Sequence, residues 1–263
     1  MRIAVIGAGH MGSWLIRELS KNHSLGVIEI DRDRVVPADQ AVRLNAYADL
    51  AEFGPDILIN AASLNRTIEA FESALPHLPP GCLIADIASV KARIPEFYAS
   101  SGFRFASAHP MFGPTFANVE NLKNENAIII SESDPAGRLF FRDFFAGYGM
   151  NIFEYNFEEH DRMIGYSLAL PFASTLVFAA CMTDLAVPGT TFKKHLEIAK
   201  GLLSEDDFLL AEIIFNPPAL AQLENITGRL EFLKHVIRAR DTEEAIRFFN
   251  GLRKNLGLPR PTP

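Results

Sequence analysis

Residues 2–12 read RIAVIGAGHMG, an apolar run followed by three glycines at the spacing G-x-G-x-x-G. The run predicts a buried strand, and residues 10–21 have the pattern of an amphipathic helix. In that setting Gly7 permits a tight turn, Gly9 lets a phosphate approach the backbone, and Gly12 lets the helix pack on the strand. Unpaired N–H groups at the helix N-terminus would face the phosphates. The stretch predicts the phosphate-binding loop of a dinucleotide-binding domain; without a ligand it would be only a tight strand–helix turn.

The alternation of strand and helix continues through the first half of the chain. Apolar runs that predict strands occur at residues 25–30, 56–62, 82–88, 103–108, 127–131 and 150–155. The stretch 35–47 has a weaker pattern and predicts an irregular or shortened helix. Strands that alternate with helices form right-handed crossovers and a mainly parallel sheet covered on both faces. We therefore expect an α/β domain of the Rossmann type, doubly wound, over residues 1–156.

From residue 157 onward the strand pattern disappears, and helical patterns continue to residue 256. Residues 163–183 carry no charged side chain, and that length could span a bilayer. The run is single and internal, and it contains Pro171 and several hydroxyl groups. A helix covered on all sides, in a large core or a dimer, fits these features better. We expect an all-helical domain over residues 157–263 that forms a homodimer and has no membrane contact.

The composition is that of an ordinary globular protein. Of 263 residues, 48% are hydrophobic and 22% are charged, which argues against disorder. The formal net charge of −7 gives no general reason to bind nucleic acid or anionic membranes. Cys82 and Cys181 are too few for a disulfide framework and favour a reducing compartment. Because the sequence opens directly into a predicted strand, without the features of a signal peptide, we expect a cytoplasmic protein.

Further residues would complete the dinucleotide site. Asp31 lies 22 residues after Gly9. At the end of the second predicted strand it would accept the ribose hydroxyls and disfavour the extra phosphate of NADP; otherwise it is a solvated turn residue. Arg32 could stack on adenine or tolerate a phosphate, so NAD is expected, with NADP as the alternative. The expected cofactor contacts are Gly7, Ala8, Gly9, His10, Met11, Gly12, Asp31, Arg32, Ala62 and Ser63.

One histidine has the position expected of a general base. His109 directly follows a predicted parallel strand, at the carboxyl edge where open α/β sheets bind ligands. Pro110 and Pro114 would restrict its loop, and the near-neutral pKa of imidazole suits proton removal as a hydride leaves. Ser89 follows the preceding strand at the same edge, where it would cap a helix, bind a substrate hydroxyl, or do both. The alternative for His109 is a loop residue with only packing partners.

These motifs occur in the order seen in a known family. The sequence resembles the prephenate/arogenate dehydrogenase family over nearly the whole chain. The motifs that carry the resemblance are GAGHMG at 7–12, DIASVK at 86–91, HPMFGP at 109–114, and EEHDRM followed by LALPF at 158–172. The resemblance implies oxidative decarboxylation of prephenate to 4-hydroxyphenylpyruvate in tyrosine biosynthesis, with NAD accepting the hydride and no metal required. It implies that His109 accepts a hydrogen bond, and then the proton, from the ring hydroxyl. It also implies that Ser89 contacts that hydroxyl and that the helical domain forms a dimer.

The chain departs from the family pattern at two places. Phe172 stands where members often have histidine, and the segment 206–215 lacks an arginine that members often carry. A small anionic precursor with two carboxylates then needs other cations or polar groups. The candidates for contacts with this substrate are His160, Arg162, Lys194 and Arg229. For each of them, a place on a solvated helix face is the alternative.

Other functions fit parts of the same pattern. An arogenate dehydrogenase would act on a substrate with an amine in place of the keto group, and no residue in the sequence distinguishes it. Another NAD(P)-dependent hydroxyacid oxidoreductase with the same two-domain plan would not need HPMFGP. A non-catalytic dinucleotide sensor would keep the glycine loop but would have no use for His109.

Overall fold

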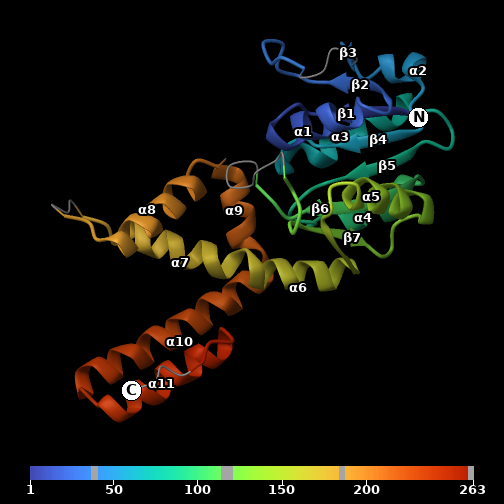
Figure 1. The fold of residues 1–263 in the computed structure, drawn as a ribbon. Coiled ribbons are helices and arrows are strands. Elements are labelled where there is room, and N and C mark those ends of the chain that lie inside the picture. The colour runs from blue at the N-terminus through green and yellow to red at the C-terminus, as the bar shows by residue number, and fades with distance from the viewer. Residues whose placement is uncertain (37–40, 114–120, 184–186, 206, 260–263) are drawn as a thin grey trace.

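The first part of the chain folds around one eight-stranded sheet (Figure 1). The computed structural model describes residues 1–36, 41–113, 121–183, 187–205 and 207–259. The strands are β1 (Arg2–Ile6), β2 (Ser24–Ile28), β3 (Ala41–Leu44), β4 (Ile57–Asn60), β5 (Leu83–Asp86), β6 (Arg104–Pro110), β7 (Asn126–Ile130) and β8 (Asn151–Tyr155). They lie in the order β3-β2-β1-β4-β5-β6-β7-β8. The first six follow the Rossmann order, which confirms the predicted fold class.

The strand that carries His109 is paired on both sides. All neighbours from β3 to β6 are parallel, whereas β7 runs antiparallel to β6, with His109 opposite Ile128. The pairing of β6 with β5 ends at Ser107, and the pairing with β7 continues to Pro110. The prediction that His109 lies in a loop beyond the strand was therefore wrong. Pro114, which was expected to stiffen that loop, lies outside the described residues.

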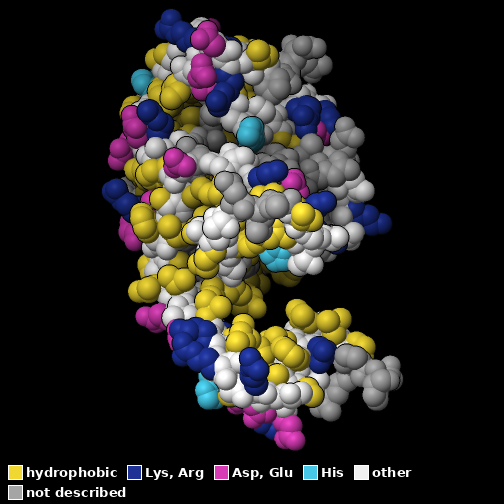
Figure 2. All heavy atoms as spheres, turned by 90° about the vertical axis from the view of Figure 1, so that its left-hand side faces the viewer, with side chains coloured by type: hydrophobic (Ala, Val, Ile, Leu, Met, Phe, Trp, Pro, Cys, Tyr) yellow, Lys and Arg dark blue, Asp and Glu magenta, His cyan; other side chains and the backbone are white. Residues whose placement is uncertain are grey.

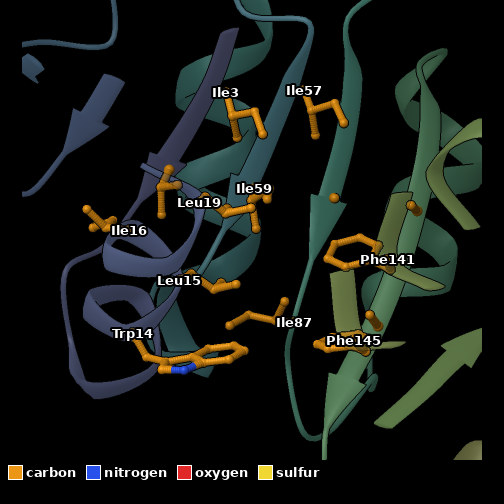
Figure 3. Close-up of a cluster of buried hydrophobic side chains, with 14 of the residues drawn as sticks. Ile3, Trp14, Leu15, Ile16, Leu19, Ile57, Ile59, Ile87, Phe141 and Phe145 are labelled. Carbon is orange, nitrogen blue, oxygen red and sulfur yellow. The ribbon is translucent and has the colours of Figure 1, made fainter. Parts of the chain in front are cut away.

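Helices cover both faces of the sheet. They are α1 (His10–Leu19), α2 (Asp49–Phe53), α3 (Thr67–Ala74), α4 (Ile94–Ser101) and α5 (Pro135–Ala146), with short 3-10 turns at Leu64–Arg66 and Leu75–His77. One apolar cluster joins the sheet to α1 and α5, where Trp14, Phe141 and Phe145 are buried (Figure 3). A second cluster joins the other face to α2, α3 and α4 through residues such as Phe71. Strands that are buried on both faces consist of continuous apolar residues, so the apolar runs in the sequence predict where these strands lie.

Two element predictions were wrong for local reasons. The stretch 35–47 contains the edge strand β3 rather than a helix, and residues 37–40 lie outside the described part of the chain. With four residues, of which only Leu44 is buried, β3 leaves little pattern to detect. The predicted helix 163–183 divides at Leu168 into two helices. Pro171, in the first turn of the second helix, has no N–H to donate to the carbonyl of Ser167.

After β8 the described chain is helical. Its helices are α6 (Phe157–Ser167), α7 (Ala169–Ala180), α8 (Thr190–Leu202), α9 (Asp207–Phe215), α10 (Pro217–Ala239) and α11 (Thr242–Asn255). Helices α6 to α9 lie beside the sheet domain, whereas most of α10 projects away from it with α11 folded back alongside (Figure 1). We refer to α10 and α11 together as the helical arm.

The helical region leaves much apolar surface uncovered. Within α7 only Ala169 is buried. The helical stretch Phe157–Ala180 is long and apolar enough to cross a membrane, and only 17% of its most apolar window is buried. Figure 2 shows hydrophobic side chains on both sides of a notch between the helical arm and the rest of the molecule. The expectation that the uncharged helix is covered on all sides is therefore not met within one copy of the chain.

Candidate active site

The glycine loop joins β1 to α1 in a geometry that requires two of its glycines. Gly7 has a φ of +91°, and a Cβ there would lie 2.8 Å from the carbonyl oxygen of Ala61. A Cβ on Gly12 would lie 2.1 Å from the Gly7 oxygen, so glycine at this position lets α1 start close to β1. Gly9 is the N-cap residue of α1, and no side chain caps this helix. Its first N–H groups are therefore available to phosphate oxygens.

A carboxylate at the end of β2 contacts this loop, and it belongs to Glu29 rather than to Asp31. β2 ends at Ile28, and Glu29 Oε2 accepts a hydrogen bond from the Ala8 N–H at 2.7 Å. Both carboxylates lie near Arg34, Glu29 at 3.7 Å and Asp31 at 3.9 Å, but the Glu29 side chain is only 5% exposed whereas that of Asp31 is 51% exposed. The prediction that Asp31 closes the strand was wrong because the strand is two residues shorter than its apolar pattern. Glu29, the first acid after β2, was missed.

A buried ion pair joins the carboxyl ends of β5 and β6. Lys91 Nζ donates to Asp86 Oδ2 at 2.7 Å and to the carbonyl oxygen of Ala108 at 2.8 Å. The Tyr98 hydroxyl donates to the other Asp86 oxygen at 2.8 Å. Lys91 and Asp86 have no exposed surface, and burial lowers the pKa of Lys91 against the opposing effect of Asp86. The pair fixes the backbone immediately before His109, a role that the DIASVK motif did not reveal.

Ser89 lies in the loop between β5 and α4. Because α4 begins at Ile94, with Arg93 at its N-cap position, the interpretation of Ser89 as a helix cap was wrong. Ala92 has a φ of +31°, so the chain turns sharply between the buried Lys91 and the helix. Ser89 is half-buried and lies in the wall of the cavity described below. Its contact with a ligand hydroxyl therefore stays a prediction that the position allows.

His109 packs against a second histidine from the helical region. Its Nδ1 lies 3.1 Å from Nε2 of His160 on α6, and the two rings meet edge to face. His109 is 5% exposed and His160 has no exposed surface. Burial holds the pKa of His109 well below its ordinary value, and His160 and Lys91 act in the same direction. His109 is consequently neutral near pH 7 and can accept a proton.

A cavity of about 470 Å³ brings six of the predicted residues together. His10 and Met11 of the glycine loop, Ala62 and Ser63 after β4, Ser89 and His109 all line it. Residues of α7, α8 and α9 complete its wall, so the cavity lies between the sheet and the helical region. A larger open groove of about 1050 Å³, at the amino ends of the strands, contains none of the predicted site residues. The smaller cavity is the candidate site because it alone of the two contains His109.

The residues predicted to bind the substrate do not line this cavity. Arg162, Lys194 and Arg229 are exposed on α6, α8 and α10. Arg32, which was predicted to contact the cofactor, is exposed after β2 and does not line the cavity either. His160 is covered by protein and meets His109 instead of a ligand. Among the described lining residues none is lysine or arginine; Phe172 contributes an apolar wall and Glu205 an acidic side chain. The sequence could not show which of these side chains line the cavity, because the exposure of a helix residue depends on how the helical region packs against the sheet domain.

Known proteins resemble both the sequence and the fold. A family model, prephenate dehydrogenase, nucleotide-binding domain, matches residues 16–137. A probable arogenate/prephenate dehydrogenase of Methanocaldococcus jannaschii is 24% identical over 98% of this chain. These two matches support the prephenate/arogenate dehydrogenase family for this chain. It spans 61% of the length of that relative and about half to two thirds of the other curated family relatives that it matches.

Solved structures of the prephenate/arogenate dehydrogenase family have the same fold along nearly the whole chain. The crystal structure of prephenate dehydrogenase from A. aeolicus, in complex with hydroxyphenyl propionate and NAD+, has a TM-score of 0.82 at 18% identity. The alignment covers 97% of this chain and 96% of that one. Synechocystis arogenate dehydrogenase has a TM-score of 0.72 at 20% identity, over 97% and 100% of the two chains. The likeness in fold therefore includes the helical region as well as the nucleotide-binding domain.

Proposed function

We propose that the chain is an NAD-dependent prephenate dehydrogenase that forms 4-hydroxyphenylpyruvate for tyrosine biosynthesis. The observation that carries the proposal is His109, a buried and neutral imidazole in the wall of the cavity that is also lined by His10 and Met11 of the GAGHMG motif. Similarity to the prephenate/arogenate dehydrogenase family supports the same activity. The A. aeolicus structure supports it further, since that protein holds NAD+ together with a phenol that bears an acid side chain.

The residues at the glycine loop fit a dinucleotide. Gly9 leaves space at an uncapped helix N-terminus, where backbone N–H groups would hold the pyrophosphate. Glu29, next to this loop, has the position from which an acid accepts ribose hydroxyls and repels a 2′-phosphate. When bound, NAD would supply a nicotinamide ring that accepts a hydride. We therefore assign the preference for NAD over NADP to Glu29.

The reaction needs one base, and overall it neither consumes nor releases a proton. As the hydride leaves the ring carbon that bears the hydroxyl, His109 takes the hydroxyl proton and a carbonyl group forms. Loss of carbon dioxide from the opposite ring carbon then makes the ring aromatic and leaves a negative charge on that oxygen. His109 returns the proton to the oxygen, so one imidazole serves as base and then as acid. Apolar walls such as Phe172 keep water from competing for that proton.

A second candidate substrate is arogenate. Glu205 is acidic, and no lysine or arginine is present among the described residues that line the cavity. A carboxylate in the wall would attract the ammonium group of arogenate, whereas prephenate has no ammonium group and carries two carboxylates. The chemistry at His109 is the same for both substrates and does not distinguish them. We keep prephenate as the first proposal and arogenate as the second.

We also propose that the protein works as a cytoplasmic homodimer. Its apolar α7 and the exposed apolar residues of the helical arm need a cover that one copy does not supply. A second copy of the chain would cover them without any other partner.

Steady-state turnover tests the proposed activity directly. Purified protein is mixed with prephenate, arogenate or a panel of hydroxyacids, each with NAD or NADP, and formation of the reduced nicotinamide is followed. The highest kcat/KM is expected for prephenate with NAD. Faster turnover of arogenate would select the second candidate, and turnover of a hydroxyacid alone would overturn both. Binding of NAD without turnover of any substrate would identify a dinucleotide sensor.

A further inference from the structure

His109 has a hydrogen-bonding partner in the other part of the molecule. His160, on α6, places its Nε2 3.1 Å from His109 Nδ1. His160 has no exposed surface, so it cannot touch a ligand in the cavity. Its contact with the family's motif histidine therefore needs an explanation other than substrate binding. The inference that follows rests on the proposed function, because it assigns a task to His109.

The chain of contacts continues from His160 to a carboxylate. His160 Nδ1 lies 3.1 Å from Asp161 Oδ1. An ionised carboxylate only accepts hydrogen bonds, so His160 Nδ1 carries the hydrogen of this bond. In a neutral His160 the Nε2 atom then has a lone pair and accepts. His109 Nδ1 must therefore carry a hydrogen, which leaves Nε2 as its proton-accepting atom.

We propose that Asp161 and His160 are positioning residues that fix the tautomer of His109, so that its Nε2 accepts the substrate proton. The charged groups facing the two rings are Asp86 at the end of β5, Lys91 in the loop that follows it, and Asp161 on α6. Burial and Lys91 lower the pKa of His160 and Asp161 raises it, the overall direction being down. A neutral His160 is the state that the chain of hydrogen bonds requires.

The start of α6 is built to hold His160 in place. The Asn156 side chain accepts from the Glu159 N–H, and the Glu159 side chain accepts from the Asn156 N–H. Phe157 stacks on Phe105 of β6, with ring centroids 6.1 Å apart. These contacts fix the helix end on the same strand that carries His109. Such support limits the freedom of the imidazole in the way that preorganised sites require.

Two substitutions of His160 separate positioning from packing. His160→Gln keeps an oxygen that can accept from His109 Nδ1, whereas His160→Met fills similar space without a comparable acceptor. We expect the Met variant to lose roughly tenfold to a hundredfold in kcat, the scale of losing a supporting partner, with KM for NAD unchanged. The acid limb of its kcat profile should move to higher pH, because His160 lowers the pKa of His109 and the Met variant removes that effect. The Gln variant should recover most of the lost kcat, and the exposed control His235→Gln should match wild type.

Nitrogen NMR of the labelled full-length protein tests the tautomer without turnover. In the wild type we expect a protonated Nδ1 and an unprotonated Nε2 on His109, and the Met variant should lose this pattern. A hydrogen on Nε2 of wild-type His109 would overturn the inference, as would a Met variant with normal kcat and an unmoved pH profile. The expected tautomer without turnover of any substrate would instead overturn only the proposed function.

Discussion

At His109 the protein keeps water away from an imidazole, and the proposed role as a base requires that imidazole to be neutral. The ring is nearly buried, and its pKa lies well below the ordinary value, first because of burial and then because of His160 and Lys91. A base with a lowered pKa is unprotonated over the whole neutral range. The acid limb of the pH–rate profile should therefore lie below the usual histidine pKa of about 6.5, with a flat rate above it.

His109→Asn tests the base itself. Turnover should fall by roughly a hundredfold to ten-thousandfold, because asparagine can form a hydrogen bond but cannot take up the proton. NAD affinity should stay close to wild type, since the loop contacts lie on β1 and α1. Steady-state kinetics and NAD titration measure the two effects, with the exposed His195→Asn as a control. More than half of wild-type turnover in the His109→Asn variant, with the chemical step limiting, would contradict the assignment.

We expect the choice between NAD and NADP to depend on the acid nearest the glycine loop. Glu29→Gln should narrow the preference for NAD over NADP by about tenfold, equivalent to about 1.4 kcal/mol, because the neutral amide no longer repels a 2′-phosphate. Asp31→Ser should change the preference less, since the Asp31 side chain is half exposed beyond the strand end. Comparing kcat/KM for the two cofactors in both variants decides between the acids. A larger effect at Asp31 would restore the role that its spacing first indicated.

Among the elements, β5 and β6 depend on one buried ion pair. Lys91→Met should lower the free energy of unfolding by about 3–5 kcal/mol, because it leaves the Asp86 carboxylate buried without a counter-ion. The double variant Asp86→Asn with Lys91→Met should lose less than the single variant, since no uncompensated charge remains. Denaturant unfolding of the single and double variants measures the difference. Equal losses would mean that packing of the lysine chain, rather than its charge, holds the strand ends together.

The elements that the sequence predicts well are those whose pattern is local. Continuous apolar runs located seven of the eight strands, and the three glycines located the first loop. Strand β3 escaped because only one of its four residues is buried. The contact between His109 and His160 was not predicted, because the two residues are 51 positions apart and meet only when α6 packs on β6. Residue types and spacing identified His109, but only packing shows which atoms surround it.

For the whole molecule, the exposed apolar surface predicts an assembly. Leu223, Leu230 and Ile237 are exposed on α10 and recur every seven residues, so they form one stripe along the helical arm. Wild-type protein should be a dimer at micromolar concentration by light scattering. Leu230→Glu should shift it toward monomer, because a carboxylate would be buried at the interface. Leu139→Glu, at a leucine on α5 that is 58% exposed against 48% for Leu230, is the matched control.

Two results would contradict that assembly. A monomeric wild type would leave the apolar stripe without a second copy to cover it. Recovery of the protein only from membranes, in detergent, would instead assign the apolar helical stretch Phe157–Ala180 to a bilayer.

The antiparallel neighbour of β6 has a consequence for motion on long timescales. β6 pairs with β5 up to Ser107 and with β7 from Ala108 to Pro110, so the backbone of this strand can open to solvent only when the sheet itself opens. Backbone amides of β6 should therefore exchange with deuterium among the slowest in the chain, and those of the glycine loop among the fastest. Addition of NAD should slow exchange in the loop and leave β6 unchanged. The cofactor would thus bind to a loop whose backbone opens readily, whereas proton transfer would take place on a strand whose backbone opens rarely.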